Sequence, residues 1–395
     1  MSETTAAPGT APALRRARRA ATVAFLAHGL IAAAWVARIP QIKGHLGLSD
    51  GVLGLALLGA PAGVVAATRA AGPAIARWSS RTVTLAAGAA GAAAVVAIGL
   101  SWNLPSLVAA LLALGASLGM MDVGMNAQGV AVERRYGRPL MSGLHGAYSV
   151  GTLAVALAGA GAAHAHVPVA AHLAVLAAAV LAVLAIGCRG LLDASADVHE
   201  EPDADAAPAA GRAGRWALAM LGVIGLCSFV GEGAMADWSA VYLKEDLGTG
   251  PGLAGLGYAG CAVAMAAGRL AGDAVVARFG PVPVLRAGSL VAATGLGAGL
   301  LLAHPAAAVT GFTLFGLGVA VVAPVTFSAA GNLPGVPAAT GIARVTSLGY
   351  LGLLGGPPVI GLLAEGAGLP WALAVPAVLA AMIVVLGGAA GRAGR

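Results

Sequence analysis

The chain has 395 residues, of which 59% are hydrophobic and 10% are charged, and its formal net charge is +6. Soluble domains carry about 25% charged residues, so the composition excludes an ordinary water-soluble protein and favours helices that cross a lipid bilayer. The alternation of polar and apolar residues that is typical of outer-membrane barrels is absent, because Ala, Leu and Gly dominate the apolar runs. We therefore expect an all-α membrane protein.

The N-terminal stretch 1–19 is rich in Ala, Pro, Thr and Arg, and we expect it to be disordered and cytoplasmic. Four arginines between residues 15 and 19 precede the first apolar run, as basic residues do in a signal peptide. The run that follows is long, lacks a clear cleavage site and ends near Trp35 and Arg38. These features favour an uncleaved first span.

Twelve apolar runs follow, each about as long as a helix that crosses the hydrocarbon. They lie at 20–39, 51–76, 82–101, 107–131, 141–163, 169–188, 216–237, 252–277, 283–303, 306–330, 340–364 and 370–390. The pattern predicts an N-terminal six-helix bundle over 20–188 and a C-terminal six-helix bundle over 216–391. The segment 189–215 between them holds six of the 16 acidic residues and is rich in Ala and Pro, which indicates a flexible linker.

The basic residues indicate the topology. With the N-terminus inside, 17 of the 22 Lys and Arg lie on the inner side, and only Arg38, Lys43 and Lys244 lie on the outer side. Arg69 and Arg269 fall within spans. This bias predicts a multi-pass protein of the cytoplasmic membrane with both termini in the cytoplasm. Because the charge is explained by topology, we expect no nucleic-acid partner.

Residues 66–88 recur 200 positions later as residues 266–288, with nine of 23 positions identical, among them Arg69/Arg269 and Gly88/Gly288. A charged residue inside an apolar run, with glycines in the same register, indicates a duplicated unit. Duplicated, apolar chains of this length are typical of secondary transporters.

Several stretches resemble the major facilitator superfamily, near its fucose-permease-like branch. The segment Gly72–Arg81 keeps the glycine and two basic positions of that family's G-x-x-x-D-R-x-G-R-R/K motif, with Ala76 and Ser79 in place of Asp and Gly. The other similar stretches are WVARIPQIK at 35–43, MDVGMNAQGVAVERR at 121–135, GRPLMSGLH at 137–145 and GEGAMADW at 231–238. The resemblance implies the major facilitator fold, with twelve transmembrane helices in two pseudo-symmetric bundles, and a transport function.

Ionisable side chains inside the spans are the candidate proton sites, because each costs about 2.5–3.5 kcal/mol to insert. We predict proton-coupling roles for Asp122 and Glu232, since burial favours the protonated carboxyl group, and for His145, since imidazole titrates near neutral pH. Each could instead be a hydrogen-bonded packing residue. Gly231 and Gly233 flank Glu232, which predicts a bend or break there.

Polar and aromatic residues near these positions are the candidate substrate ligands. They are His28, Trp35, Asn126, Tyr148, Asp237 and Trp238. Asn126 lies one helical turn after Asp122, and Tyr148 lies one turn from His145. The simpler alternatives are that His28 is a packing residue, that Trp35 is an interfacial anchor and that Asp237 marks the end of a span.

The family resemblance implies a cytoplasmic gate, made of charged residues at the inner ends of the spans. These are Arg69, Arg77, Glu133, Arg138, Arg269, Asp273 and Arg344. In the resembled family such charges hold the cytoplasmic side closed when the cavity opens outward. We expect this set to bind no substrate.

The sequence lacks a G-x-x-x-x-G-K-[ST] phosphate loop, a Ser/His/Asp set on one helix face and cysteines at metal-ligand spacing. We therefore expect no enzyme activity, no cofactor and no metal site. The predicted function is secondary transport by a monomer, with a proton as coupling ion and a small hydrophilic solute such as a sugar bound near mid-membrane between the halves. The alternatives are a proton-driven exporter of drugs or apolar metabolites, and a transport-inactive membrane sensor or scaffold.

Overall fold

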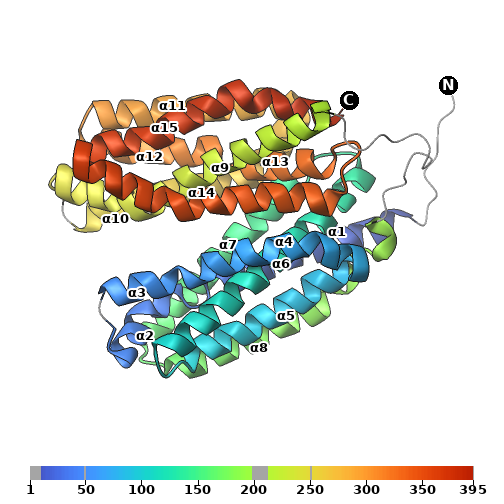
Figure 1. Ribbon diagram of the computed structural model, residues 1–395, viewed down its shortest axis with the longest axis horizontal. Coiled ribbons are helices and arrows are strands. Elements are labelled where there is room, and N and C mark those ends of the chain that lie inside the picture. Colours follow the sequence, from blue (N-terminus) through green and yellow to red (C-terminus); the bar gives the residue numbers. More distant parts are fainter. Residues whose placement is uncertain (1–9, 49, 198–211, 250, 395) are drawn as a thin grey trace. The chain divides into compact units, whose positions relative to one another are not determined.

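The computed structural model describes residues 10–48, 50–197, 212–249 and 251–394, and these residues are almost entirely helical (Figure 1). They form two compact units. Unit 1 holds the described residues up to 140 and from 147 to 197, and unit 2 holds residues 141–146 and the described residues from 212 onward.

In unit 1, α6 is the central helix and packs against α1, α4 and α5, while α8 packs against α1 and α5. The elements are α1 (Thr10–Ala33), η1 (Val36–Arg38), α2 (Ile39–Leu46), α3 (Asp50–Leu57), α4 (Gly59–Trp78), α5 (Ser80–Gly99), α6 (Leu104–Tyr136), α7 (Met141–His164), α8 (Val169–Gly187), η2 (Cys188–Gly190) and η3 (Ala194–Ala196). The first six residues of α7 belong to unit 2.

In unit 2, α9 packs against α10, α14 and α15, and α12 packs against α10 and α11. The elements are α9 (Arg212–Val241), the π-helical turn η4 (Tyr242–Asp246), α10 (Pro251–Phe279), α11 (Pro281–Leu301), α12 (Pro305–Val319), α13 (Val322–Gly331), α14 (Ala338–Ala367), α15 (Leu369–Leu386) and η5 (Gly387–Gly394).

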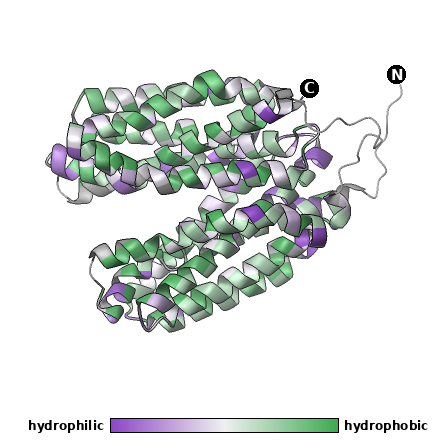
Figure 2. Cartoon of the chain, in the orientation of Figure 1, coloured by the Kyte–Doolittle hydropathy of each residue, from purple (hydrophilic) through white to green (hydrophobic). Residues whose placement is uncertain are grey.

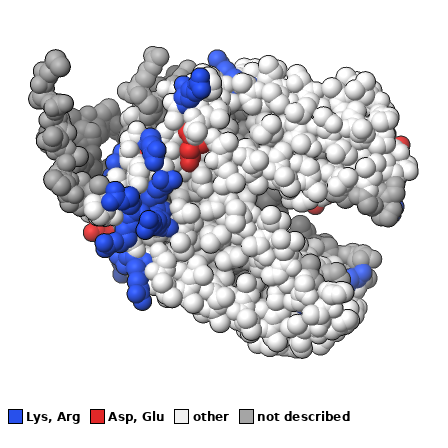
Figure 3. Space-filling model, turned by 180° about the vertical axis from the view of Figure 1, so that it is seen from behind, with Lys and Arg blue, Asp and Glu red and all other residues white. Residues whose placement is uncertain are grey.

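Twelve segments of the described chain are long and apolar enough to cross a membrane, which agrees with the twelve predicted runs. Figure 2 shows apolar residues along most of their length and hydrophilic residues mainly toward their ends. In the view of Figure 3, most of the visible Lys and Arg lie near one end of unit 1, and much of the visible surface of each unit is uncharged. An uncharged flank is what a helix needs where it faces hydrocarbon.

Local signals in the sequence account for several helix ends. The Asn103 side chain caps α6 by accepting a hydrogen bond from the Ser106 amide at 2.9 Å, and the Ser106 hydroxyl oxygen accepts one from the Asn103 amide at 3.2 Å, so the pair forms a capping box. The same helix ends at Gly137, which has a φ of 65° that a glycine adopts without strain. Helix α1 begins at Thr10, so residues 10–19 are helical and the predicted disorder is wrong there. Residues 1–9 and 198–211 lie outside the described part.

Glycine allows close helix contacts in both units. A Cβ atom on Gly115 of α6 would lie 1.7 Å from the carbonyl oxygen of Ala60 on α4. In unit 2, a Cβ atom on Gly288 would lie 2.6 Å from the carbonyl oxygen of Gly318, and one on Gly318 would lie 2.3 Å from that of Gly288. These pairs pack backbone to backbone, which is how small residues stabilise helices in lipid.

Candidate functional site

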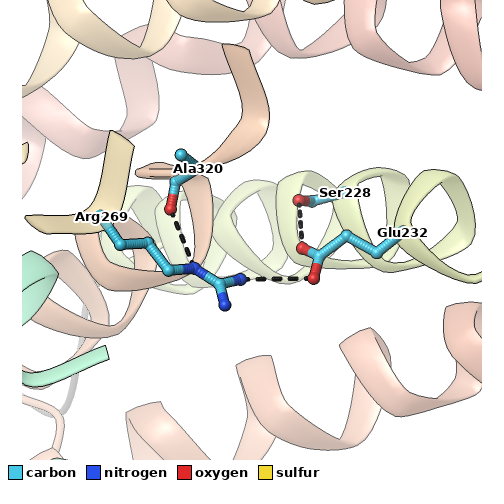
Figure 4. Close-up of polar contacts among 4 residues, drawn as sticks. All are labelled: Ser228, Glu232, Arg269 and Ala320. Atoms are coloured by element: carbon cyan, nitrogen blue, oxygen red, sulfur yellow. Dashed lines mark hydrogen bonds and ion pairs between the residues drawn. The ribbon is translucent and has the colours of Figure 1, made fainter. Parts of the chain in front are cut away.

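An ion pair inside the spans of unit 2 joins α9 to α10 (Figure 4). The Arg269 Nη2 atom lies 3.3 Å from Glu232 Oε2, and the side chains are 8% and 20% exposed. The Ser228 hydroxyl, one turn earlier on α9, donates to Glu232 Oε1 at 3.2 Å. The carboxylate therefore has a charged partner on a neighbouring helix and a polar partner on its own helix.

The other side of the guanidinium contacts the chain at the break between α12 and α13. Arg269 Nε donates to the Ala320 carbonyl oxygen at 3.3 Å, at the two residues that separate these helices. In a continuous helix the amide of residue 324 would bond to this oxygen. Residue 324 is proline and has no amide hydrogen, so the Ala320 carbonyl is left for Arg269. The four residues in Figure 4 thus form one connected chain of hydrogen bonds.

The predicted break beside Glu232 is wrong. Helix α9 runs without interruption through this residue, and the break lies at Ala320 instead. A Cβ atom on Gly231 would lie 2.3 Å from the Phe315 ring, so this glycine makes room for a neighbouring aromatic side chain. Its small size therefore serves packing.

In unit 1, Asp122 and Asn126 lie on one face of α6, as their spacing predicts. The Asn126 Nδ2 atom donates to the Asp122 carbonyl oxygen at 2.8 Å and to its carboxylate Oδ1 at 3.1 Å. Both residues are buried, with 6% and 0% exposure. The Asn126 Oδ1 atom is enclosed and has no hydrogen-bond partner. This unit therefore also holds a buried carboxylate with an amide beside it.

His28 lies next to this turn of α6. Its Nε2 atom is 3.2 Å from the Leu118 carbonyl oxygen, and its ring is 5.5 Å from the Tyr148 ring, centroid to centroid. A carbonyl oxygen can only accept, so Nε2 carries the hydrogen and the Nδ1 atom of a neutral ring is an acceptor. That Nδ1 atom is buried without a partner. The structure therefore brings His28 and Tyr148 together, and His28 contacts α6 one turn before Asp122.

The remaining candidate ligands are placed separately. His145 lies in the part of α7 that belongs to unit 2, where Nδ1 is 2.9 Å from the Met141 carbonyl oxygen and the ring stacks on Phe327. Trp35 is buried beside η1. Asp237 is exposed, and Trp238 packs near Gly361 with its Nε1 atom buried and unpaired.

The predicted gate residues do not share one environment. Arg69, Arg77, Arg138 and Arg344 are exposed. Arg269 is 7% exposed and bonds to Glu232, so the structure groups it with a candidate proton site.

Two acids of the predicted gate accept hydrogen bonds from backbone amides near the start of α7. Glu133 Oε2 accepts from the Leu140 amide at 2.7 Å. Asp273 accepts from the amides of Ser142 and Gly143, each at 2.8 Å. Both carboxylates therefore stabilise the chain where α7 begins.

Sequence reasoning missed four polar contacts. Ser228 and Ala320 complete the cluster of Figure 4. Gln128 is fully buried in unit 1 and holds the segment after α8 through both backbone groups of Leu192. Arg38, predicted on the outer side at the end of the first span, is 2% exposed and donates to the Val167 carbonyl oxygen at 2.6 Å. Only Ala320 had a usable signal, the proline four residues later.

Within the described residues, no group of three or more His, Cys, Asp and Glu is placed to hold a metal ion, and the three cysteines are buried and free. Each of the two clusters instead places a carboxylate inside a span beside a polar or charged partner.

No protein-family profile matches the chain. It is 38% identical over 367 residues to an uncharacterized MFS-type transporter of Yersinia pestis, which covers 90% of this chain and 91% of the relative. Its fold is similar to that of FucP in the outward conformation, with a TM-score of 0.75, 18% identity and coverage of 94% and 97%. It is also similar to the human organic anion transporter MFSD10, with a TM-score of 0.74, 15% identity and coverage of 95% and 99%.

These similarities agree with the twelve candidate spans and with the predicted fold class. The match to the Yersinia transporter extends over nearly the whole of both chains, so it is not confined to one shared bundle. The chain is a multi-pass membrane protein and belongs to the major facilitator superfamily of transporters.

Proposed function

We propose that this transporter takes up a small hydrophilic solute together with a proton, by alternating access, across the cytoplasmic membrane with both termini inside. The observation that carries the proposal is the Glu232–Arg269 pair inside the apolar spans of unit 2. A proton on Glu232 would remove the charge that holds Arg269, so protonation and the arrangement of the cluster are linked.

Two further features support the proposal. Asp122 is a second buried carboxylate, with Asn126 bonded to it. The solved structures with a similar fold include one described as the E. coli fucose:proton symporter FucP, with a TM-score of 0.68 and 17% identity. That identity supports the fold alone, and the coupling comes to this chain as part of the proposal.

The test is solute-driven proton movement in proteoliposomes. The purified protein is reconstituted with a pH-sensitive dye inside, and sugars, polyols and sugar acids are added outside under an imposed pH gradient. We expect at least one solute to accelerate internal acidification. Glu232→Gln and Asp122→Asn should abolish coupled accumulation, and Asp122→Asn should leave solute exchange intact. Asp193→Asn is the control, because its side-chain contacts are to Ser195 in an exposed turn.

Other results would indicate a different function. Gradient-driven extrusion of a hydrophobic dye, with no solute-driven acidification, would identify an exporter. No flux across the whole panel would favour a sensor or scaffold. Unchanged accumulation in both carboxylate variants would show that neither acid carries the proton.

A further inference from the structure

The end of unit 1 at which α1 begins is strongly basic, and most of the visible Lys and Arg of Figure 3 lie there. Ten arginines belong to this basic end. They come from the starts of α1 and α5, from the ends of α4, α6 and α8, and from the turn before α7. They are Arg15, Arg16, Arg18, Arg19, Arg77, Arg81, Arg134, Arg135, Arg138 and Arg189. Arg81 is half-buried and the others are exposed.

Contacts between these segments bring the arginines onto one surface. A Cβ atom on Gly190 would lie 2.8 Å from the Arg16 carbonyl oxygen, so η2 packs closely on the first turns of α1. The Gln128 side chain of α6 donates to the Ser80 hydroxyl at the start of α5, at 2.7 Å. The Asp197 carboxylate, in the segment after α8, accepts from the Ser80 amide at 2.7 Å. The basic end therefore rests on helix ends that hydrogen bonds and close packing fix to one another.

Two of the arginines lie against one aromatic ring. In the first turns of α1, Ala17 is 1% exposed, whereas the four arginines of residues 15–19 are exposed. The Cζ atoms of Arg18 and Arg138 lie 5.7 and 5.4 Å from the centre of the Tyr136 ring, which attracts cations. The sidedness of the spans requires only an excess of basic residues near their inner ends. Guanidinium groups held against a shared ring therefore go beyond what the topology needs.

The described acids of this end offset only part of its charge. Glu133 is 9% exposed and accepts a hydrogen bond from a backbone amide. Asp197 is bonded to the start of α5. Asp193 is exposed and lies within electrostatic range of Arg81 and Arg135. Ten arginines thus face three acids within the described part of this end, so a large positive charge remains on its surface.

The basic end lies where the spans end, which is the level of lipid headgroups. Trp78, the last residue of α4, is 58% exposed, and the Arg77 Cζ atom lies 5.9 Å from the centre of its ring. Tryptophan is enriched at the membrane–water interface. Arginines near the membrane surface attract anionic headgroups, and a guanidinium can donate two parallel hydrogen bonds to a phosphate. Position, charge and hydrogen-bond donors therefore all suit the headgroup of an anionic lipid.

We propose that the basic end of unit 1 binds the headgroup phosphate of an anionic phospholipid such as phosphatidylglycerol, with Arg18 and Arg138 beside Tyr136 as its central ligands. The predicted topology places this lipid in the cytoplasmic leaflet. The site is separate from the buried carboxylate clusters, so it does not depend on the proposed transport.

The test is thermal unfolding of the purified full-length protein in an uncharged detergent, with phosphatidylglycerol or phosphatidylcholine of the same acyl chains added. We expect only phosphatidylglycerol to raise the melting temperature, and about 1 M salt to remove this effect, because exposed charges are then screened. In Arg18→Gln/Arg138→Gln, the mole fraction of phosphatidylglycerol that gives half of the effect should rise about tenfold or more. Arg278→Gln/Arg344→Gln is the matched control. It removes the same charge from exposed positions of unit 2 and should change this mole fraction by less than about twofold.

Several results would overturn the inference. One is an equal effect of the two lipids, another is a response that persists in high salt, and a third is an equal loss in the two double variants. Inorganic phosphate that protects as well as phosphatidylglycerol would show a site for soluble anions instead. The linker acids Glu200, Glu201, Asp203 and Asp205 lie outside the described residues and are the alternative occupant. If the wild type ignores phosphatidylglycerol and a variant with these four acids changed to amides responds to it, the linker occupies the basic end and the inference is wrong.

Discussion

A carboxylate from another helix, that of Asp273, binds the start of α7. Removing this carboxylate gives a quantitative test of the predicted gate. The residue before α7, Leu140, offers no side-chain cap. Asp273 supplies one from α10, with Oδ1 accepting from Ser142 and Oδ2 from Gly143, each at 2.8 Å. A hydrogen bond to a charged group contributes about 1.5–3 kcal/mol. Asp273→Ala should therefore weaken this contact by about 3 kcal/mol or more, which is about 150-fold in an equilibrium constant.

Gly143→Ala perturbs the same contact without changing any charge. A Cβ atom at this position would lie 2.6 Å from Asp273 Oδ2, so the carboxylate has to move away. Both variants should raise the amide hydrogen exchange of residues 141–146, by about 100-fold for Asp273→Ala. Asp193→Ala is the control and should leave this exchange unchanged, because Asp193 contacts only the nearby Ser195 in the bonds described.

The transport rate should fall in the same two variants. The first six residues of α7 belong to unit 2 and the rest to unit 1, so a contact that fixes the first turn restrains a helix that both units share. We expect Asp273→Ala to lower turnover in proteoliposomes by about tenfold or more and to leave the apparent solute affinity within about threefold. Two results for Asp273→Ala would refute the assignment of Asp273 to the gate. One is unchanged amide hydrogen exchange of residues 141–146, and the other is a lost affinity for the solute with normal turnover.

Two further substitutions test the packing and the helix break. Gly115→Ala should lower the melting temperature strongly, because its Cβ atom would lie 1.7 Å from the Ala60 carbonyl oxygen, whereas Gly161→Ala, with no atom within 4 Å, should leave it nearly unchanged. Equal melting temperatures would show that the close contact relaxes without cost. Pro324→Ala supplies an amide hydrogen to the Ala320 carbonyl oxygen, so it should keep or raise the melting temperature and reduce transport as Arg269 loses that acceptor. Full transport in this variant would show that the Ala320 bond is dispensable.

The spans could be predicted from the sequence because the hydropathy of a segment depends only on its own residues. A run of about 20 apolar residues has to cross the hydrocarbon wherever its neighbours lie. The contact between Asp122 and Asn126 could likewise be predicted from their spacing, since both lie on one helix. The start of α1 could not be predicted in this way. Its first residues are polar and arginine-rich, yet alanine favours a helix there and Ala17 packs with 1% exposure.

Contacts between helices were beyond sequence reasoning, because they depend on how each helix is rotated about its axis. The prediction placed Arg269 with the gate residues because it lies toward the inner end of its span, as charged gate residues do in the resembled family. The structure gives the two arginines different surroundings. Arg69 is exposed, whereas Arg269 is buried and bonded to Glu232, 37 residues away on α9.

The difference between the two arginines comes from residues outside the repeated segments 66–88 and 266–288. Arg269 bonds to Glu232 on α9 and to the carbonyl oxygen of Ala320, which Pro324 leaves without its helical partner. The acid offsets the charge of the guanidinium and the carbonyl oxygen holds its other side, so both contacts help to keep a buried arginine in place. A repeated sequence therefore preserves the position of an arginine within its helix but not its partners, because other helices supply them.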